Sequence, residues 1–374
     1  MGPRFRKYLE RTQVTYYLVV GLILIVLLKV ALLIFFNGYG YPVFGEGNDS
    51  NFYHHYAISN EIRDAPSIWP SILRFLNSVD LYGRVFISYM LQFIGVILVP
   101  LLAAKISLTN KRSGNVNASL LLALLLSFYP TLFYYTLDIW RDVFMVFCFL
   151  CGVFLVKEYI RKQGVFSIVL IWIMIILMCA FMYGLRPYLG FSFAVAFIGF
   201  GFLKMNSKYF FFLVIFYVLS LLVLYETGVL DPLLKYRGLF ETVENGGTNL
   251  DHSSEDGFIL GFLKGWFQQL LGFYFGNTQS IFLFIMEGVP FLFSIVYVII
   301  NRRFSTGLVN FLMLFFVIYA SIFVIANANY GTGVRLRLFP YLSVYLSAFI
   351  IYQNKTLDLK NARLEKLTGV KWTH

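Results

Sequence analysis

Four arginines stand in very short turns between apolar segments of this chain: Arg141, Arg186, Arg335 and Arg337. The distribution of charge along the chain predicts that these turns lie on the outer side of a membrane, where short loops ordinarily lose Lys and Arg. A guanidinium matches a phosphate group with two parallel hydrogen bonds, which a lysine ammonium does not. We therefore expect the four arginines to hold an anion, with phosphate as the natural candidate. The alternative is that they pair with outer carboxylates and only fix the loops.

The strongest of these anion-site candidates lies just before the last apolar segment. Gly331 and Gly333 would let backbone N–H groups approach a ligand closely, because glycine has no side chain. Arg335 and Arg337 are two residues apart, and in an extended segment they would point the same way. The pattern predicts that both guanidiniums face one ligand.

Candidates for proton transfer follow the first apolar segment. Asp49 and Ser50 are good N-cap residues and predict the start of a short helix there. A carboxylate at this place would suit a general base for a hydroxyl group, and His54 or His55 would suit the same task near neutral pH. The alternatives are that Asp49 is a plain helix cap and that the histidines are solvated or packed on aromatic rings.

A further acidic cluster lies at the outer end of the third and fourth apolar segments. Asp138 and Arg141 are three residues apart and are expected to share a helical face. Pro130, before them, is expected to kink its helix and open a cavity. We interpret Arg141 as a phosphate ligand oriented by a carboxylate, with Asp138 as a second candidate for proton transfer. The alternative is an Arg–Asp pair that closes the hairpin.

The composition places these residues on a membrane protein. Of 374 residues 59% are hydrophobic and 13% charged, against about 25% charged in a soluble domain. Successive apolar runs long enough to cross a bilayer predict an all-α polytopic membrane protein. We expect about ten spanning helices, which place both termini on one side, over residues 15–36, 86–104, 117–136, 143–159, 165–184, 188–203, 209–225, 279–300, 305–326 and 338–352.

The distribution of charge fixes the expected orientation. The side that carries both termini holds 19 basic residues against four acidic ones, so it is the cytoplasmic side. The two sides also differ in the kind of base, with eight Arg and eleven Lys inside, but eight Arg and two Lys outside. Because topology needs only positive charge, the excess of arginine outside indicates binding of a planar oxyanion. The net charge of +11 therefore belongs to membrane orientation and is no sign of nucleic-acid binding.

We expect one integral membrane domain over residues 1–374, with two longer outer loops at about 37–85 and 226–278. The first apolar run is too long for a signal peptide and is expected to be a retained span. In the second loop, aromatic and apolar residues recur every four positions from Phe258 through Trp266 to Tyr274, which suits a helix lying in the membrane interface.

Few other residues indicate chemistry. Lys29 and Glu287 lie within predicted spans, where an ionisable side chain suggests a function by default, although Lys29 would also suit snorkelling. The predicted spans hold no histidine, which argues against membrane acyltransferases that use one as a base. The three cysteines sit in apolar runs and are expected to be packing residues.

Three short motifs stand at the outer ends of the apolar segments: Gly-Asn-Asp-Ser-x-x-Tyr at 47–53, Pro130…Tyr134-Tyr135…Arg141-Asp142, and Arg335-x-Arg337-x-x-Pro340. They resemble motifs of bacterial O-antigen and capsular polysaccharide polymerases of the Wzy type. The chain is also similar in architecture to GT-C glycosyltransferases, which use lipid-phosphate sugars. It lacks their paired acids in the first outer loop, where Glu46 and Asp49 are the nearest, and their large soluble C-terminal domain. Both departures favour the polymerase.

This resemblance implies an enzyme of the inner membrane that joins oligosaccharide repeats carried on undecaprenyl diphosphate. The four turn arginines would bind and stabilise the departing diphosphate, and Asp49, His54 or His55 would take the proton of the acceptor hydroxyl. Four aromatic side chains would stack on sugars: Tyr134, Tyr135, Trp266 and Tyr330. No metal or cofactor is expected, since the arginines can neutralise the diphosphate. The partners implied are lipid-linked glycans and membrane lipid, with a chain-length regulator and a flippase.

Two other functions stay open from the sequence. One is a GT-C transferase that adds a single sugar from a polyprenyl-phosphate donor. The other is a transporter or flippase of lipid-linked glycans, which would show charges through the membrane midplane and an inverted repeat. Apart from Lys29, the predicted midplane carries almost no charge.

Overall fold

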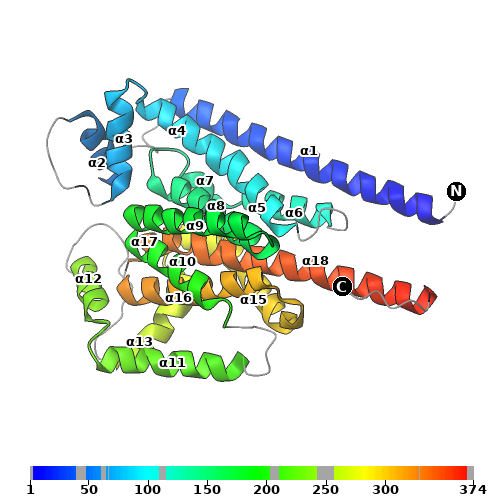
Figure 1. Ribbon diagram of the computed structural model, residues 1–374. Coiled ribbons are helices and arrows are strands. Elements are labelled where there is room, and N and C mark those ends of the chain that lie inside the picture. The colour runs from blue at the N-terminus through cyan, green and yellow to red at the C-terminus, as the bar shows by residue number, and fades with distance from the viewer. Residues whose placement is uncertain are drawn as a thin grey trace. The chain divides into compact units, whose positions relative to one another are not determined.

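The structure is a computed structural model that describes residues 3–38, 48–59, 65, 67–108, 115–202, 210–241, 257–327 and 329–368 (Figure 1). Within these ranges the regular elements are helices, as the apolar runs predict. The helices pack into two compact units. The first is residues 1–190 with 352–374, and the second is residues 191–351.

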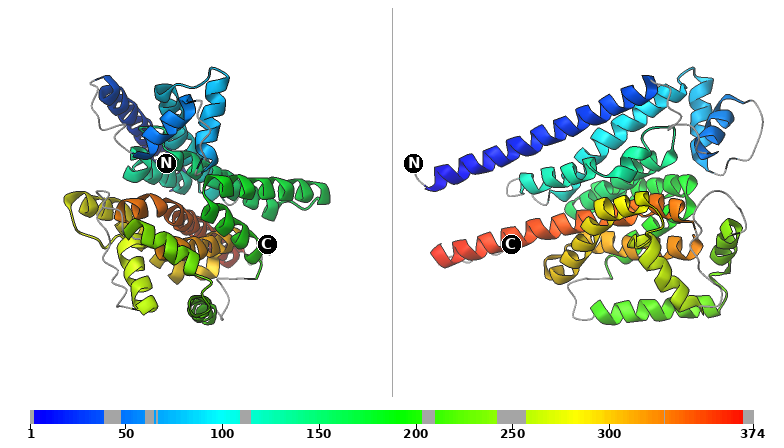
Figure 2. Two further views of the ribbon diagram at one scale, coloured as in Figure 1. Left: turned by 90° about the vertical axis from the view of Figure 1, so that its left-hand side faces the viewer. Right: turned by 180° about the vertical axis from the view of Figure 1, so that it is seen from behind.

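The first unit contains the N-terminal helices and the end of the last helix. Its long helix α1 packs along α6 and a π-helical turn, η1, and Figures 1 and 2 show α1 beside α4 and α5. Its elements are α1 (Pro3–Gly38), α2 (Asn48–Ile58), α3 (Ile68–Ser78), α4 (Arg84–Phe93), η1 (Ile94–Leu98), α5 (Val99–Ser107), α6 (Val116–Ser127), α7 (Pro130–Tyr134), α8 (Arg141–Arg161), α9 (Val165–Leu185), the start of α10 (Pro187–Gly199) and the end of α18 (Leu338–Thr368).

The second unit contains the remaining helices. Within it α16 packs against α12 and α13. Its elements are the rest of α10, α11 (Phe210–Glu226), α12 (Asp231–Glu241), α13 (Gly257–Gly265), η3 (Trp266–Leu270), α14 (Thr278–Leu283), η4 (Phe284–Gly288), α15 (Val289–Ile300), η5 (Arg302–Phe304), α16 (Gly307–Ala326), α17 (Tyr330–Leu336) and the start of α18.

Seven helical stretches in the described residues are long and apolar enough to cross a membrane, which identifies a helical polytopic membrane protein. Each coincides with a span predicted from sequence. The three other predicted spans correspond to shorter or broken helices. The predicted span 188–203 overlaps the 13-residue α10, and the predicted span 209–225 overlaps α11, which is bent by 74° against α12. The predicted span 117–136 is broken, because α6 ends at Ser127 and Pro130 begins a new short helix, α7.

Local sequence explains where many of these helices begin. The side chains of Asn115, Thr306 and Asn329 each accept a hydrogen bond from the backbone N–H three residues later, which caps α6, α16 and α17. Proline explains two of the π-helical turns. Pro100 and Pro290 follow η1 and η4 by two residues, and a proline lacks the N–H that an ordinary α-helical turn would use.

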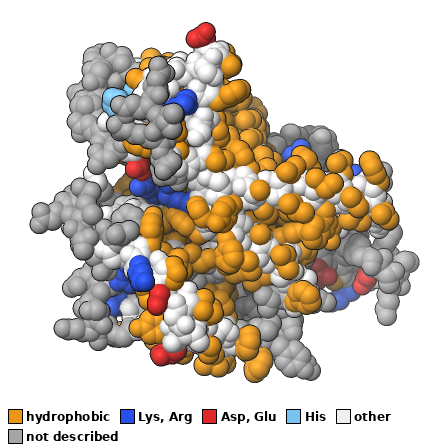
Figure 3. Space-filling view, turned by 60° about the vertical axis from the view of Figure 1, so that its left-hand side comes forward, with side chains coloured by type: hydrophobic (Ala, Val, Ile, Leu, Met, Phe, Trp, Pro, Cys, Tyr) orange, Lys and Arg blue, Asp and Glu red, His pale blue; other side chains and the backbone are white. Residues whose placement is uncertain are grey.

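Large hydrophobic side chains cover much of the surface seen in Figure 3, with few charges among them. Many of the exposed large hydrophobic side chains of the described residues belong to α1 and α9, whose apolar windows are only 11% buried inside the structure. Such faces need lipid as their solvent, because a soluble protein rarely exposes apolar patches of this size.

Polar contacts gather at the two ends of the first unit. At the end predicted to be cytoplasmic, the Lys157 ammonium donates to the carbonyl oxygens of Lys105, Ile106 and Leu108 at 2.6–2.8 Å, which closes the C-terminus of α5. Gln353 of α18 donates to the Ser107 carbonyl at 3.0 Å beside it. The opposite end, formed by α2, α3 and the turn before α8, carries the candidate site.

Candidate functional site

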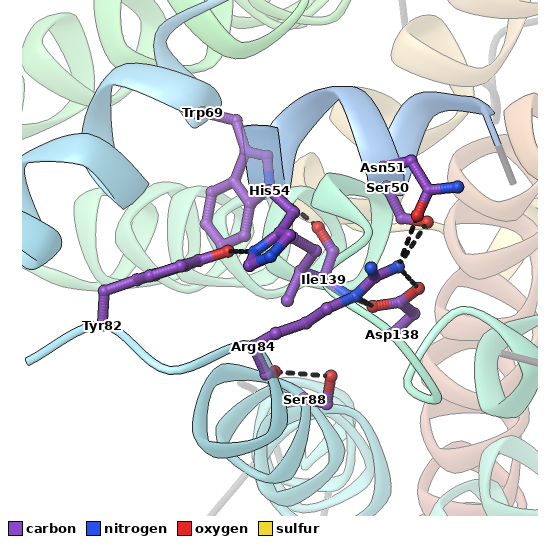
Figure 4. Close-up of polar contacts among 9 residues, drawn as sticks. All are labelled: Ser50, Asn51, His54, Trp69, Tyr82, Arg84, Ser88, Asp138 and Ile139. Carbon is purple, nitrogen blue, oxygen red and sulfur yellow. Dashed lines mark hydrogen bonds and ion pairs between the residues drawn. The ribbon is translucent and has the colours of Figure 1, made fainter. Parts of the chain in front are cut away.

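The short helix α2 lies at the centre of the candidate site, and Arg84, the first residue of α4, ties it to the turn before α8 (Figure 4). The guanidinium of Arg84 binds Asp138 in a bidentate way, with Nε 3.0 Å from Oδ1 and Nη2 2.6 Å from Oδ2. The same Nη2 donates to Ser50 Oγ at 3.3 Å and to Asn51 Oδ1 at 3.0 Å, both on α2. This geometry corrects the expectation that Asp138 shares a helical face with Arg141, because Asp138 lies in a turn outside the helix and pairs with Arg84.

Asp138 is held as a carboxylate. Burial alone would raise its pKa, but hydrogen bonds from Arg84 and from the Ile139 backbone N–H outweigh burial and keep the pKa below its ordinary value. The turn itself is anchored by Trp69, whose indole N–H donates to the Ile139 carbonyl at 2.9 Å. Gly95 permits this packing, since a Cβ on it would come within 2.5 Å of Thr136. Asp138 therefore suits an electrostatic partner better than a base.

His54 has the properties of a base. Its Nδ1 lies 2.8 Å from the Tyr82 hydroxyl, and the two rings are stacked (Figure 4). Burial lowers the pKa of His54, and the charges of Arg84 and His55 lower it further, while Asp138 acts the other way. Burial also raises the pKa of Tyr82 to about 12, so this phenol keeps its proton. His54 is therefore neutral at pH 7, whereas the side chain of His55 is exposed.

Two of the predicted phosphate ligands, Arg141 and Arg186, act on another residue of α2, Tyr53. Tyr53 is only 3% exposed, and burial raises its pKa to about 12. The charges of Arg141, Asp49, Asp142 and Arg186 all act on the Tyr53 hydroxyl. Since such interactions fade with distance, the four charged groups lie near this phenol.

The two arginines are held differently. Arg141 Nη1 donates to the Leu185 carbonyl at 3.3 Å, at the C-terminus of α9. Arg186 lies 3.7 Å from Asp142, too far for a hydrogen bond, and Asp142 is 1% exposed. Arg186 is placed by the tight hairpin between α9 and α10, in which a Cβ on Gly190 would come within 2.4 Å of a backbone nitrogen of α9.

Arg335 and Arg337 belong to the second unit, and their geometry differs from the expectation. The segment that carries them is helical: α17 spans Tyr330–Leu336, and Arg337 ends it in a helical conformation. Two residues along a helix turn a side chain to the opposite face, so the two guanidiniums do not point the same way. The Arg335 side chain is half-buried, whereas Arg337 is 0% exposed and its Nη2 lies 3.0 Å from Glu287 Oε2.

A buried polar core surrounds the Arg337–Glu287 pair. Tyr345 donates to the Glu287 carbonyl at 3.0 Å, and Tyr341 donates to the Leu270 carbonyl at 2.7 Å. Leu270 and Glu287 lie in the two π-helical turns η3 and η4. Gly272 follows η3 with φ +78° and passes Arg337 Nη1 so closely that a Cβ would lie 3.0 Å from it.

The four predicted sugar-stacking residues divide between the units. Tyr134 and Tyr135 lie edge to face in the first unit, where Tyr134 is 49% exposed and Tyr135 is buried against Trp140. In the second unit Trp266 packs on Phe316, and Tyr330 packs on Tyr274. Of the four, Tyr134 has the most exposed ring for stacking.

The first unit thus brings together six of the predicted site residues around α2: Asp49, His54, His55, Asp138, Arg141 and Arg186. Sequence reasoning missed two residues that organise them, Tyr82 and Arg84, and it gave Ser50 and Tyr53 only as part of the 47–53 motif. The only sequence signal for Arg84 was its place among the outer arginines. In the described part of the chain, no group of His, Cys, Asp or Glu side chains could hold a metal ion.

Comparisons with protein-family models, curated proteins and solved structures find no match for this chain. The resemblance to polysaccharide polymerases therefore stays a prediction that rests on the motifs.

Proposed function

We propose that this protein is a membrane glycosyltransferase that polymerises oligosaccharide repeats carried on undecaprenyl diphosphate, at the outer face of a bacterial inner membrane. One observation carries the proposal. A neutral histidine, a carboxylate and two arginines converge on α2 at one end of an apolar helical unit. Transfer of a sugar from a lipid diphosphate needs such a set: a base for the acceptor and cations for the departing diphosphate.

In the proposed reaction, the acceptor hydroxyl oxygen of one lipid-linked repeat bonds to the anomeric carbon of the growing glycan. The bond from that carbon to the lipid diphosphate breaks, and the diphosphate takes the electron pair. His54 or Asp49 accepts the hydroxyl proton. Arg141 and Arg186 stabilise the charge that develops on the diphosphate, because fixed cations in a site of low dielectric need little reorganisation.

The proposal places the diphosphate on Arg141 and Arg186 for a geometric reason. Arg337 is fully buried and hydrogen-bonded to Glu287 at 3.0 Å, so a ligand would first have to displace that pair. Arg186 is also buried, but it lies 3.7 Å from Asp142, beyond hydrogen-bond distance. Tyr134, whose ring is half exposed beside the turn that carries Asp138, is the best placed of the aromatic residues to stack on a sugar.

The test is a glycan ladder on a gel, from a strain that lacks this protein and is complemented with variants. We expect Arg186→Gln to abolish the ladder and leave a single repeat attached to its final acceptor. The matched control is Arg161→Gln at the far end of α8, where an exposed arginine pairs with Glu158 and should leave the ladder intact. Membrane levels of each variant are measured by immunoblot.

Three results would contradict the proposal. An unchanged ladder with Arg186→Gln would remove the arginines from the reaction. Loss of even the single repeat would place the protein in an earlier step, as a flippase or a single-addition transferase. A product of one added sugar in a purified system would identify a transferase of the GT-C kind.

A further inference from the structure

The segment from Tyr82 to Arg84, which ends at the first residue of α4, contacts α2 at two successive turns. Ser50 and His54 are four residues apart and share one face of α2. Arg84 reaches Ser50 at 3.3 Å, and Tyr82, two residues earlier, lies 2.8 Å from His54 Nδ1 (Figure 4). The position of the imidazole thus depends on a segment outside its own helix.

The other side of Arg84 is fixed to the turn before α8. Its bidentate contact with Asp138 uses the planar fork of the guanidinium, which a lysine does not reproduce. Asp138 also accepts the Ile139 N–H at 2.8 Å, and that peptide is held by Trp69 of α3. Arg84 therefore joins three separate parts of the first unit at the end where His54 lies.

We propose that Arg84 is a positioning residue that, together with Asp138, holds the imidazole of His54 in place for proton transfer. The inference rests on the proposed function only in giving His54 a hydroxyl proton to accept. With its proton on Nδ1, donated to the Tyr82 oxygen, the ring presents the Nε2 lone pair to an acceptor. Tyr82 fixes the ring, and Arg84 fixes the helix turn that carries it.

The charges around His54 make the inference testable. Arg84 and His55 act on the ring as cations and Asp138 acts as an anion, while Tyr82 stays neutral. On α3, which packs against α2, Arg74 is engaged elsewhere, because its Nε and Nη2 both donate to the Tyr56 carbonyl at 2.9–3.0 Å. Arg84 and Asp138 therefore act on His54 with opposite signs from the two ends of one ion pair.

The experiment compares Arg84→Met with Asp138→Asn in the purified full chain, since both break the same pair. The protonation midpoint of His54 is followed by NMR of labelled histidine and assigned with His54→Gln. We expect Arg84→Met to raise the midpoint and Asp138→Asn to lower it. The control is Arg74→Met, which also releases a contact of α2 but removes no charge that acts on His54, so its midpoint should stay at the wild-type value.

Shifts of the same sign in the two variants, or no shift in either, would overturn the inference, because a ring held beside this ion pair must respond to its two charges with opposite signs. If Arg84→Met does not fold, a midpoint in Asp138→Asn that rises or stays unchanged is by itself enough to reject it. Arg84→Lys keeps the charge and loses the fork, so it should keep the midpoint near wild type and lower the rate of ladder synthesis. If the two variants shift the His54 midpoint in opposite directions but the wild-type protein makes no ladder, the proposed function is rejected and the positioning role stands.

Discussion

Breaking the buried Arg337–Glu287 pair should be among the most destabilising single changes in the second unit. Both side chains are 0% exposed and their charged atoms lie 3.0 Å apart. Two unit charges at that distance attract by about 5–6 kcal/mol at an effective dielectric constant near 20. Removing one partner leaves the other charge buried and unpaired, which costs about 3–5 kcal/mol in proteins. We expect Arg337→Met and Glu287→Leu each to lower the free energy of unfolding by that amount.

The double variant Arg337→Met/Glu287→Leu should be more stable than either single variant, because two apolar side chains can replace an ion pair with little loss. Unfolding of the purified chain in detergent by urea, followed by tryptophan fluorescence, measures all three. Arg335→Met, two positions along the same segment and half-buried, is the control and should cost clearly less. Additive losses in the double variant, or single losses below about 1 kcal/mol, would refute the reasoning that the two charges depend on each other.

Three further predictions concern the first unit. Gly190→Ala should destabilise the protein by about 1–3 kcal/mol, because the added Cβ would lie 2.4 Å from the backbone of α9. The control is Gly201→Ala, whose Cβ would meet nothing within 4 Å and should leave the stability unchanged. Thermal unfolding in detergent measures both variants. Lys157→Met should lower the free energy of unfolding by about 2–4 kcal/mol, because three carbonyl groups lose their hydrogen-bond donor. The exposed Lys162→Met is the control and should change the stability little in the same assay. His54 has a lower pKa in the folded chain than its ordinary 6.5, so the unfolded chain binds its proton first and stability falls as the pH drops below 6.5. Unfolding measured across that range should show a smaller fall in His54→Gln.

Much of the helical framework follows from the sequence alone. Apolar runs predict the seven long spans, because the apolar length that a bilayer needs is a local property of the chain. The helix that begins near Asp49 is also local, since capping residues act within one turn. The break at Pro130 was underestimated: proline there starts a new helix, and a single span of 117–136 was wrong.

The type of each site residue was predicted from sequence, but its partner was not. Asp138 pairs with Arg84, 54 residues away, and Glu287 with Arg337, 50 residues away. A carboxylate attracts any nearby guanidinium, so local spacing favoured Arg141 for Asp138. Only packing decides which cation comes within 3 Å.

The sequence by itself determined that this is a helical membrane protein with arginines gathered at short turns, because hydropathy and charge are carried by the residues themselves. The tertiary structure decided that α2 gathers His54, Asp49 and the arginines Arg141 and Arg186, and that Arg337 is buried with Glu287 in the other unit. The physical reason is that exposure and pairing depend on contacts between segments far apart in the chain, which no local pattern records.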